Sequence, residues 1–358
     1  MRVLIITGSY PPDKCGVGDY TFHLAEALAE KPDIEVAVLT SVGLSPSSES
    51  SRVKLFRVMA NWRIRKLFLA KRFISEFKPD LVHIQYPTQG YNGGLIWLLP
   101  LLTRLLLIPV VQTWHEYFVT SGVRWPNLLA CKALIYARPD FPQKLPAWVK
   151  FFLFKTPLIY VPNISTIPVV TMSLEHIQAK KNELSGGKPI VCFFGFAHIN
   201  KGMERLFEIV DPEKHQLVLI CDLSDKNEYQ AKILQMANQA PWIGKVTVTG
   251  FQSAQRVGEI LAIADAVVFP FPSGAGEWNT SLKASEAAGA FTLATTENRA
   301  LFGYHENTNT YYAGCAQIVE MKNALSKYIG KRKPVQAENA WGKFALVHKQ
   351  IYERSLLS

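Results

Sequence analysis

The chain repeats one pattern twice: strand-length runs of continuous apolar residues that alternate with helical patterns. The runs lie at 2–8, 35–41, 80–86, 108–114 and 157–163, and again at 189–196, 216–222, 245–251, 265–271 and 289–296. Strands that are apolar on both faces are typical of parallel sheets covered on both sides by helices. The sequence therefore predicts an α/β fold with two Rossmann-like, doubly wound parallel-sheet lobes that face a cleft.

The length of 358 residues suits two domains. We place an N-terminal domain at 1–165 and a C-terminal domain at 188–336, because the segment between them is mixed in character and ends in Ser-Gly-Gly. A last helix at 337–358 is expected to cross back to the first domain.

Cysteine usage and hydropathy favour a cytoplasmic protein. The five cysteines show no C-x-x-C pair, which favours reduced thiols over a disulfide framework. The apolar N-terminal run is too short for a signal peptide and suits a buried strand. The apolar stretch 95–111 is interrupted by Pro100, Arg104 and Pro109, so a core helix and a strand are expected there rather than a membrane span.

The positive charge is concentrated in the first half of the chain. The net charge is +10, and residues 1–165 hold 19 Lys and Arg against 11 Asp and Glu. Segments 61–73 and 146–155 combine basic with aromatic residues. Either they form ordinary amphipathic helices, or they lie against an anionic membrane, which would place the protein at the inner face of the cell membrane. No zinc spacing or nucleic-acid motif is present, so we expect no nucleic-acid partner.

Ligands of open α/β sheets bind beyond the carboxyl ends of the strands. After the first run, Gly16 and Gly18 precede a helix whose amides could hold a phosphate, although they could also be plain loop glycines. A dinucleotide fingerprint is excluded: Thr21 stands in place of the third glycine, and the second run ends in Thr40 and Ser41 without an acidic residue.

Three further residues follow strand-like runs. His115 comes directly after the fourth run, and both a structural and a ligand-binding interpretation remain open. In the second lobe, Gly195 ends a run and Lys201 begins a helix. There a lysine could hold a diphosphate, or it could simply be solvated.

The segment "DAVVFPFPSGAGEWNTSL" ends the fourth run of the second lobe. The amides of Asn279, Thr280 and Ser281 begin a helix and could bind phosphate. Glu277 lies just before them, where it could bind the hydroxyls of a polyol or remain a solvated turn carboxylate. A site in which backbone amides bind phosphate and a neighbouring carboxylate binds hydroxyl groups would suit a nucleotide-sugar.

Nearly the whole chain resembles the retaining nucleotide-sugar glycosyltransferases of the GT-B fold, family 4 (group 1). The motifs that carry the resemblance are "YPPDKCGVGDYTFHLAEAL", "PDLVHIQY", "IPVVQTWHEY", "YVPN", "GFAHINKG", "VTGFQSAQRVGEILAIADAVVFPF" and the Glu277 segment. The resemblance implies transfer of a hexose, with retention, from a nucleotide diphosphate-sugar to a hydroxyl acceptor. A role in the assembly of cell-surface polysaccharide or glycolipid is expected. No metal cofactor is expected, because no Asp-x-Asp lies near the proposed phosphates.

The resemblance also implies residue roles. His115 would contact the donor sugar, Glu277 would bind its hydroxyls, and Lys201 would neutralise the diphosphate. The remaining donor contacts would be the Gly16–Gly18 loop, the amides of Thr280, Ser281 and Leu282, and Phe251 with Gln252 beside the base.

Two departures from the family pattern leave alternatives open. Phe196 replaces an arginine beside the phosphates, and Glu286 lies nine positions after Glu277 rather than eight. Ala284 then occupies the second glutamate's place, and Glu286 is turned by about 200° around the helix from it. A nucleotide-sugar epimerase or hydrolase, or a non-catalytic sugar-nucleotide-binding subunit, is the alternative. A glycan or lipid-linked acceptor is expected.

Overall fold

A computed structural model describes residues 1–43, 52–91, 96–116, 130–276, 278–335 and 339–357. The chain divides into two compact units. One comprises Met1–Pro162 with Asn339–Ser358, and the other comprises Asn163–Glu338. Each unit is an α/β domain built on its own sheet.

The first unit contains a seven-stranded parallel sheet in the order β3-β2-β1-β4-β5-β6-β7. The strands are β1 Arg2–Ile6, β2 Glu35–Ser41, β3 Val53–Met59, β4 Leu81–Tyr86, β5 Val110–Trp114, β6 Cys131–Tyr136 and β7 Leu158–Tyr160. The chain order reverses between β1 and β4, which makes the carboxyl ends of these two strands the expected place for a ligand.

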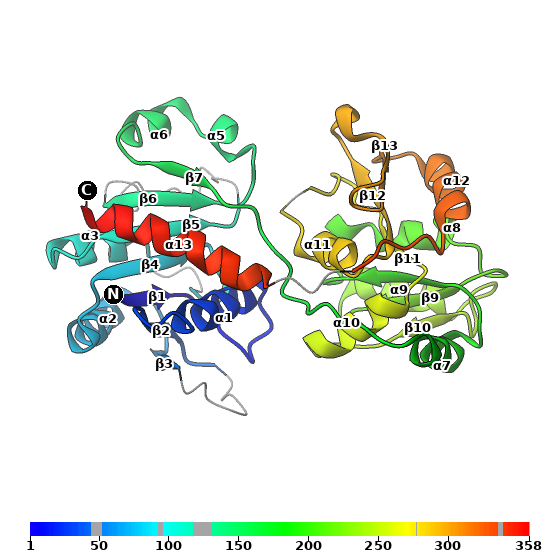
Figure 1. Cartoon of the computed structure of the whole chain (residues 1–358), viewed down its shortest axis with the longest axis horizontal. Helices are drawn as coiled ribbons and strands as arrows, with labels where there is room; N and C mark the ends of the chain where they lie inside the picture. Colours follow the sequence, from blue (N-terminus) through cyan, green and yellow to red (C-terminus); the bar gives the residue numbers. More distant parts are fainter. Residues whose placement is uncertain (44–51, 92–95, 117–129, 277, 336–338, 358) are drawn as a thin grey trace. The chain divides into compact units, whose positions relative to one another are not determined.

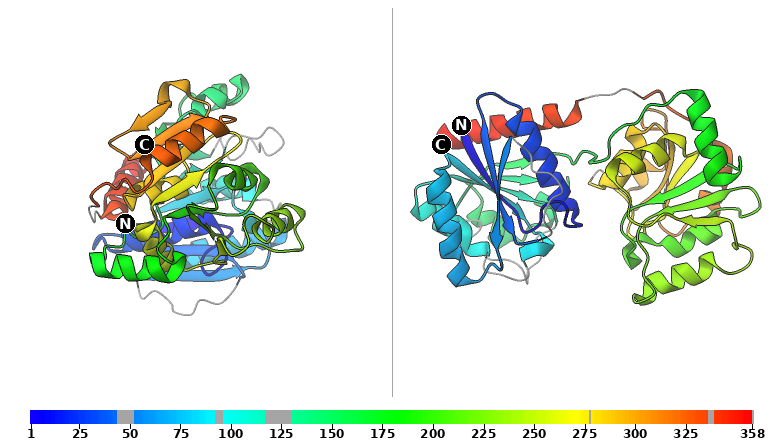
Figure 2. Two further views of the ribbon diagram at one scale, coloured as in Figure 1. Left: turned by 90° about the vertical axis from the view of Figure 1, so that its right-hand side faces the viewer. Right: turned by 90° about the horizontal axis from the view of Figure 1, so that it is seen from below.

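Helices cover both faces of this sheet, with α1 and α2 on opposite sides (Figure 2). They are α1 Gly16–Ala29, α2 Ile64–Phe77, α3 Leu99–Leu105, α5 Phe141–Lys144, α6 Ala147–Phe152 and α13 Ala340–Leu357, with short 3₁₀ turns η1 Gln89–Tyr91 and η2 Ile96–Leu98. The stretch 95–111 thus contains a short helix and the start of β5, as predicted. No helix of the described residues is long and apolar enough to cross a membrane.

The second unit repeats the arrangement in the order β10-β9-β8-β11-β12-β14-β13, parallel except for β13, which runs antiparallel to β14. The strands are β8 Ile190–Phe194, β9 Gln216–Ile220, β10 Val246–Val248, β11 Ala266–Phe269, β12 Phe291–Thr296, β13 Gly303–His305 and β14 Thr310–Gly314. The helices are α7 Leu174–Ser185, α8 Leu206–Ile209, α9 Glu228–Ala237, α10 Ala254–Ile263, α11 Thr280–Ala287 and α12 Ile318–Tyr328, with 3₁₀ turns η4 Ile199–Lys201, η5 Met203–Arg205 and η6 Arg299–Leu301.

The predicted two-lobe, doubly wound fold is confirmed, but four strands were missed: β3, β6, β13 and β14. Strand β3 lies at the sheet edge and carries Lys54 and Arg57, and β6 carries Lys132, so neither reads as a continuous apolar run. His115 consequently follows the fifth strand of its unit rather than the fourth.

The last helix, α13, belongs to the first unit and lies along α1 (Figure 1). Its buried side includes Phe344, Ala345, His348, Ile351 and Tyr352, which recur at helical spacing. The neighbouring Leu346 and Val347 are exposed. The final 18-residue helix therefore completes the core of the domain in which the chain begins.

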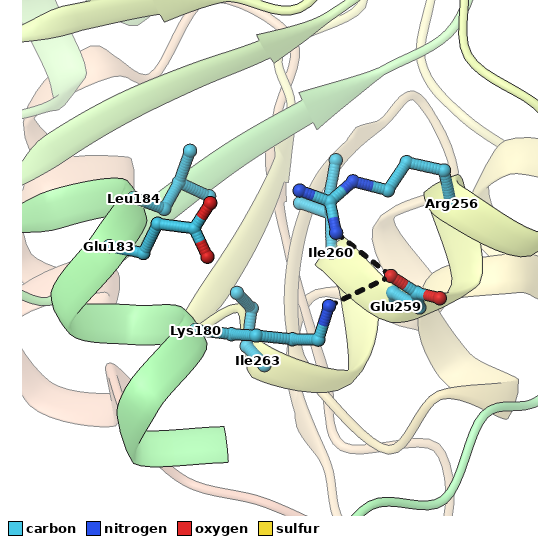
Figure 3. Close-up of a pocket in the computed structure, with 7 residues that line it drawn as sticks. All are labelled: Lys180, Glu183, Leu184, Arg256, Glu259, Ile260 and Ile263. Atoms are coloured by element: carbon cyan, nitrogen blue, oxygen red, sulfur yellow. Dashed lines mark hydrogen bonds and ion pairs between the residues drawn. The ribbon is translucent and has the colours of Figure 1, made fainter. Parts of the chain in front are cut away.

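Helix α7 lies within the predicted inter-domain junction, yet it packs on α10 in the second unit. Lys180 and Arg256 both pair with Glu259, at 3.1 and 2.8 Å, in a small hollow between the two helices (Figure 3). Lys181 pairs with Asp265 at 2.5 Å, and the other oxygen of Asp265 accepts from the Ile190 amide. These ion pairs fasten α7 to the second sheet, so we assign the hollow a structural role.

The one-sided burial of α13 leads to a prediction. Ala345→Asp places an uncompensated carboxylate on the buried side of α13 and should lower the free energy of unfolding by about 3 kcal/mol or more. Leu346→Asp, one residue away on the exposed side, should change it by less than about 0.5 kcal/mol. Urea unfolding followed by circular dichroism compares the two variants. Equal losses would show that α13 does not pack on the first unit in solution.

Candidate functional site

The first glycine pair lies in the opening turn of α1, not in the loop before it as predicted. A Cβ on Gly18 would lie 3.1 Å from the Ser9 carbonyl oxygen and 3.3 Å from the Tyr10 amide nitrogen, so this position packs directly on the loop after β1. A Cβ on Gly16 would meet nothing within 4 Å. Gly18 therefore has a packing role, while Gly16 presents open backbone at the start of the helix.

Arg57 holds the loop that joins β1 to α1. Its guanidinium donates to the carbonyl oxygen of Tyr10 at 2.9 Å and to that of Pro11, and it pairs with Asp13 at 3.4 Å. This side chain comes from β3, so it was missed together with that strand. Part of the positive charge of the first half is thereby used for structure.

His115 follows β5 and is anchored on both sides. Its backbone amide donates to the Tyr86 carbonyl at 2.9 Å, and its Nε2 lies 2.8 Å from Oε1 of Gln85. Its ring meets the Tyr20 ring edge-on, with centroids 4.8 Å apart. Burial, with a smaller contribution from His348, lowers the pKa of His115 to about 3, so the imidazole is neutral at physiological pH.

A second buried histidine, His348 of α13, joins this cluster. Its Nδ1 lies 3.0 Å from the Phe344 carbonyl oxygen, which can only accept, so Nδ1 carries the proton. Burial lowers the pKa of His348 to about 4, and the neutral ring therefore accepts at Nε2. The Tyr20 hydroxyl, 3.2 Å away, donates to it.

The hydrogen bonds continue from Tyr20 to β4 and back to α13. The Tyr20 oxygen is also hydrogen-bonded by Thr113, and the Thr113 hydroxyl lies 2.8 Å from Nε2 of His83. Nδ1 of His83 lies 2.7 Å from the Tyr352 hydroxyl. His83 is thus hydrogen-bonded at both of its ring nitrogens. Burial holds the pKa of His83 well below its ordinary value.

The sequence contained a signal for this network. His83 and Gln85 are polar residues two positions apart in the otherwise apolar run "DLVHIQY", so they share one face of β4. Buried polar side chains of this kind require partners. Which partners they find depends on α1, β5 and α13, which are far away in the sequence.

In the second unit, the turn holding Lys201 lies against the end of β11. Lys201 ends the 3₁₀ turn η4 rather than beginning a helix, and Gly202 follows in the left-handed region at φ 59°. A Cβ on Gly202 would lie 2.5 Å from the Pro270 carbonyl oxygen, so glycine is required there. The ammonium group of Lys201 lies 4.3 Å from the centroid of the Phe271 ring. Lys201 is thus held at the carboxyl ends of β8 and β11.

The start of α11 lies at the same place. An ideal Cβ on Gly195, which follows β8, would be 4.0 Å from Oγ of Ser281. The side chain of Asn279 makes no capping hydrogen bond to the helix and instead accepts from the Gly276 amide at 2.8 Å. The amides of the first turn of α11 therefore receive no side-chain cap from Asn279. Within this turn, Thr280 is exposed and Leu282 is buried.

Phe251 and Gln252 follow β10, two strands from β8 along the same sheet. Phe251 is exposed, and the Gln252 amide donates to the Thr249 carbonyl at 2.5 Å. Phe196, which stands where the family has arginine, is exposed beside Gly195. The structure thus brings Gly195, Lys201 and the start of α11 together, with Phe251 and Gln252 farther along the same edge.

Glu277 lies outside the described residues, so its role stays a prediction. Ala284 is buried, and Glu286 pairs with Lys283 at 3.1 Å and accepts from the Thr310 hydroxyl at 3.2 Å. Glu286 therefore has structural partners on α11 and β14. In the part of the chain that the structure describes, no group of three or more His, Cys, Asp or Glu side chains could hold a metal ion.

Two family models match the chain. The model described as "Glycosyl transferase 4-like domain" matches residues 15–141, and the model "Glycosyl transferases group 1" matches residues 175–287. The two ranges together span well over half of the chain, and each lies within one of the two units. The chain belongs to the group 1 glycosyltransferases of the GT-B fold. No curated protein matches this glycosyltransferase in sequence.

Solved structures share the fold of this glycosyltransferase over almost its full length. Sucrose-phosphate synthase from Thermosynechococcus elongatus is 17% identical, with a TM-score of 0.73, covering 99% of this chain and 98% of its own. Anabaena HepE in complex with UDP and glucose is 13% identical, with a TM-score of 0.66 and 99% of both chains covered. UDP-GlcNAc 2-epimerase from Methanocaldococcus jannaschii is 11% identical, with a TM-score of 0.58, covering 99% of this chain and 100% of its own.

The buried histidines predict how the stability of this glycosyltransferase depends on pH. Their folded-state pKa values are lowered, so below about pH 6.5 the unfolded chain binds protons that the native state excludes. The free energy of unfolding should therefore be highest above pH 6.5 and fall with decreasing pH, by about 1.4 kcal/mol per pH unit for each histidine. Burial raises the pKa of Asp19 to about 6, so below this pH the native state binds a proton at Asp19 more readily than the unfolded chain does. This one group therefore partly offsets the loss of stability that the three histidines cause.

Urea unfolding at several pH values between 7.5 and 5 measures this slope. His348→Asn should reduce the slope by one histidine's share, whereas His176→Asn, at an exposed position on α7, should leave it unchanged. An unaltered slope in His348→Asn would contradict the assignment of a neutral, buried imidazole.

Proposed function

We propose that the chain transfers a sugar from a nucleotide diphosphate-sugar to a hydroxyl acceptor, with retention at the anomeric carbon. The observation that carries the proposal is the convergence of Gly195, Lys201 and the first turn of α11 at the carboxyl ends of β8 and β11. The order of the sheet reverses between these two strands, which is where doubly wound sheets bind ligands. The UDP bound to HepE and the family of the chain support a nucleotide-sugar donor.

The residues gathered there suit a departing diphosphate. Cleavage of the glycosidic bond gives an oxocarbenium-like transition state, and negative charge grows on the leaving group. Lys201 supplies a positive charge, and the uncapped amides of Thr280 to Leu282 supply N–H donors at the positive end of a helix. We assign hydroxyls of the donor sugar to Glu277 and His115, and the base to Phe251 and Gln252. No divalent metal forms part of the proposal.

Two other functions fit the same fold. An epimerase, like the fold relative from Methanocaldococcus jannaschii, would form product from the donor alone. A non-catalytic subunit would bind the donor without turnover. We prefer transfer of a hexose with retention, and a role in cell-surface polysaccharide or glycolipid assembly. These proposals follow from the family resemblance.

Lys201 provides the test of the proposal. Lys201→Ala should lower kcat about 10²–10³-fold, because it removes one charge that stabilises the leaving group. Lys214→Ala is the matched control. This lysine is exposed and pairs with Asp211, and it precedes the amino end of β9, whereas Lys201 lies at the carboxyl ends of the strands. Release of nucleoside diphosphate from a panel of nucleotide-sugars, with and without acceptors, measures the effect.

Glu277→Gln should impair turnover as strongly as Lys201→Ala. Near-normal rates in both variants would overturn the assignment. Product that forms without any acceptor would point to the epimerase or hydrolase.

We further propose a lipid-linked glycan acceptor at the cytoplasmic face of an anionic membrane. The two basic segments, 61–73 and 146–155, differ in how far their aromatic side chains are exposed to meet such a membrane. In 61–73, Trp62 is buried and its indole donates to Ser41 Oγ at 2.8 Å, Leu67 is buried, and Phe73 packs on Phe56. Only Phe68 of these side chains is largely exposed. This segment suits the ordinary amphipathic helix.

Segment 146–155 has the opposite character. Four aromatic side chains on or just after α6 are exposed: Trp148, Phe151, Phe152 and Phe154, with Phe151 71% and Phe154 73% accessible. Lys144, Lys150 and Lys155 lie among them, and the sequence contains no Asp or Glu between Asp140 and Glu175. Exposed aromatic rings interspersed with lysines are complementary to an anionic lipid surface.

Vesicle flotation separates the two segments. The chain should float with vesicles of equimolar phosphatidylcholine and phosphatidylglycerol at low salt, and less at high salt, where surface charges are screened. The double variant Trp148→Ser with Phe151→Ser should lose flotation, and Phe68→Ser on α2 should retain it. Flotation of the double variant at the native level would contradict a membrane contact through α6.

A further inference from the structure

We propose that Gln85 is a positioning residue that fixes His115 in the tautomer protonated at Nε2, and so presents Nδ1 as an acceptor for a hydroxyl group of the bound sugar. This inference rests on the proposed function for the identity of the ligand. The tautomer itself depends only on contacts within the first unit.

The first step is the contact between the two side chains. Nε2 of His115 lies 2.8 Å from Oε1 of Gln85, a normal hydrogen-bond distance. An amide oxygen only accepts, so Nε2 must carry the proton. Because the imidazole is neutral, its single proton is then committed, and Nδ1 keeps its lone pair.

The second step is the orientation of the Gln85 amide, which His83 determines. The amide nitrogen of Gln85 lies 3.5 and 3.3 Å from Nδ1 and Nε2 of His83, nearly equidistant from both. Both of these nitrogens already have shorter bonds, to Tyr352 and Thr113. The amide group therefore lies over the imidazole face, where an N–H is attracted and an oxygen would be repelled. That leaves the oxygen of Gln85 for His115.

The third step concerns the free side of His115. Nδ1 has no hydrogen-bond partner among the described residues, and the residue is half-buried rather than enclosed. A nitrogen that only accepts favours a donating hydroxyl over a carbonyl or carboxylate oxygen. Sugar hydroxyls are donors of this kind, whereas a charged imidazole would offer a proton at both nitrogens.

Two-bond ¹H–¹⁵N correlation spectra of the full chain labelled at histidine nitrogen report which nitrogen carries the proton. The wild type should show His115 protonated at Nε2 from pH 5 to 8. Gln85→Leu should release the ring to a mixture of tautomers, and Gln85→Glu, which retains an acceptor oxygen, should keep Nε2 protonated. Gln112→Leu is the matched control, because Gln112 is an equally buried glutamine on β5 that accepts from Trp114.

Kinetics test the consequence for the sugar. Gln85→Leu should lower kcat/KM for the donor about tenfold, the worth of one misdirected hydrogen bond, while Gln112→Leu stays near the wild-type value. A wild-type His115 protonated at Nδ1, or an unchanged tautomer in Gln85→Leu, would overturn the inference. So would a changed tautomer with unchanged kcat/KM.

Failure of the proposed function has a different signature. A wild-type chain that neither binds nor turns over any nucleotide-sugar would refute the proposed function, and with it the assignment of a sugar hydroxyl to Nδ1. The spectra would still decide whether Gln85 sets the tautomer.

Discussion

The neutral state of three imidazoles is the constraint on which the first domain depends. His83, His115 and His348 are held neutral by burial, so each ring has one donor and one acceptor to satisfy. The Phe344 carbonyl fixes the proton of His348 on Nδ1, and the direction of the bond from Tyr20 to its Nε2 follows from it. Because these bonds join β4, β5, α1 and α13, the domain needs the last helix of the chain to complete its polar core.

In the second domain, a close contact between two backbone segments is the main constraint on the site. The turn after η4 comes so close to Pro270 that only glycine fits at position 202, and this contact places Lys201 over Phe271. Asn279 turns its side chain to the loop instead of capping α11. Local geometry thereby places a cation and the amides at the start of α11 at the carboxyl ends of β8 and β11, an arrangement that suits an anion.

The sequence predicted the two parallel sheets because most of their strands are apolar on both faces. It failed at β3, an edge strand that carries Lys54 and Arg57, and this failure hid the clamp of Arg57 on the loop after β1. Gly16 and Gly18 stand together in the sequence, but periodicity cannot separate a glycine needed for packing from one that leaves open space. That difference depends on where Ser9 and Tyr10 lie.

His115 shows why some site residues stay ambiguous at the level of sequence. A lone histidine after a strand can be structural or can bind a ligand, and from the sequence the two interpretations compete. The imidazole has two nitrogens, however, and among the described residues only its Nε2 has a hydrogen-bond partner, Oε1 of Gln85. One imidazole can therefore have both a structural and a ligand-binding role. The hydrogen bond that one nitrogen makes within the protein decides whether the other nitrogen donates or accepts toward a ligand.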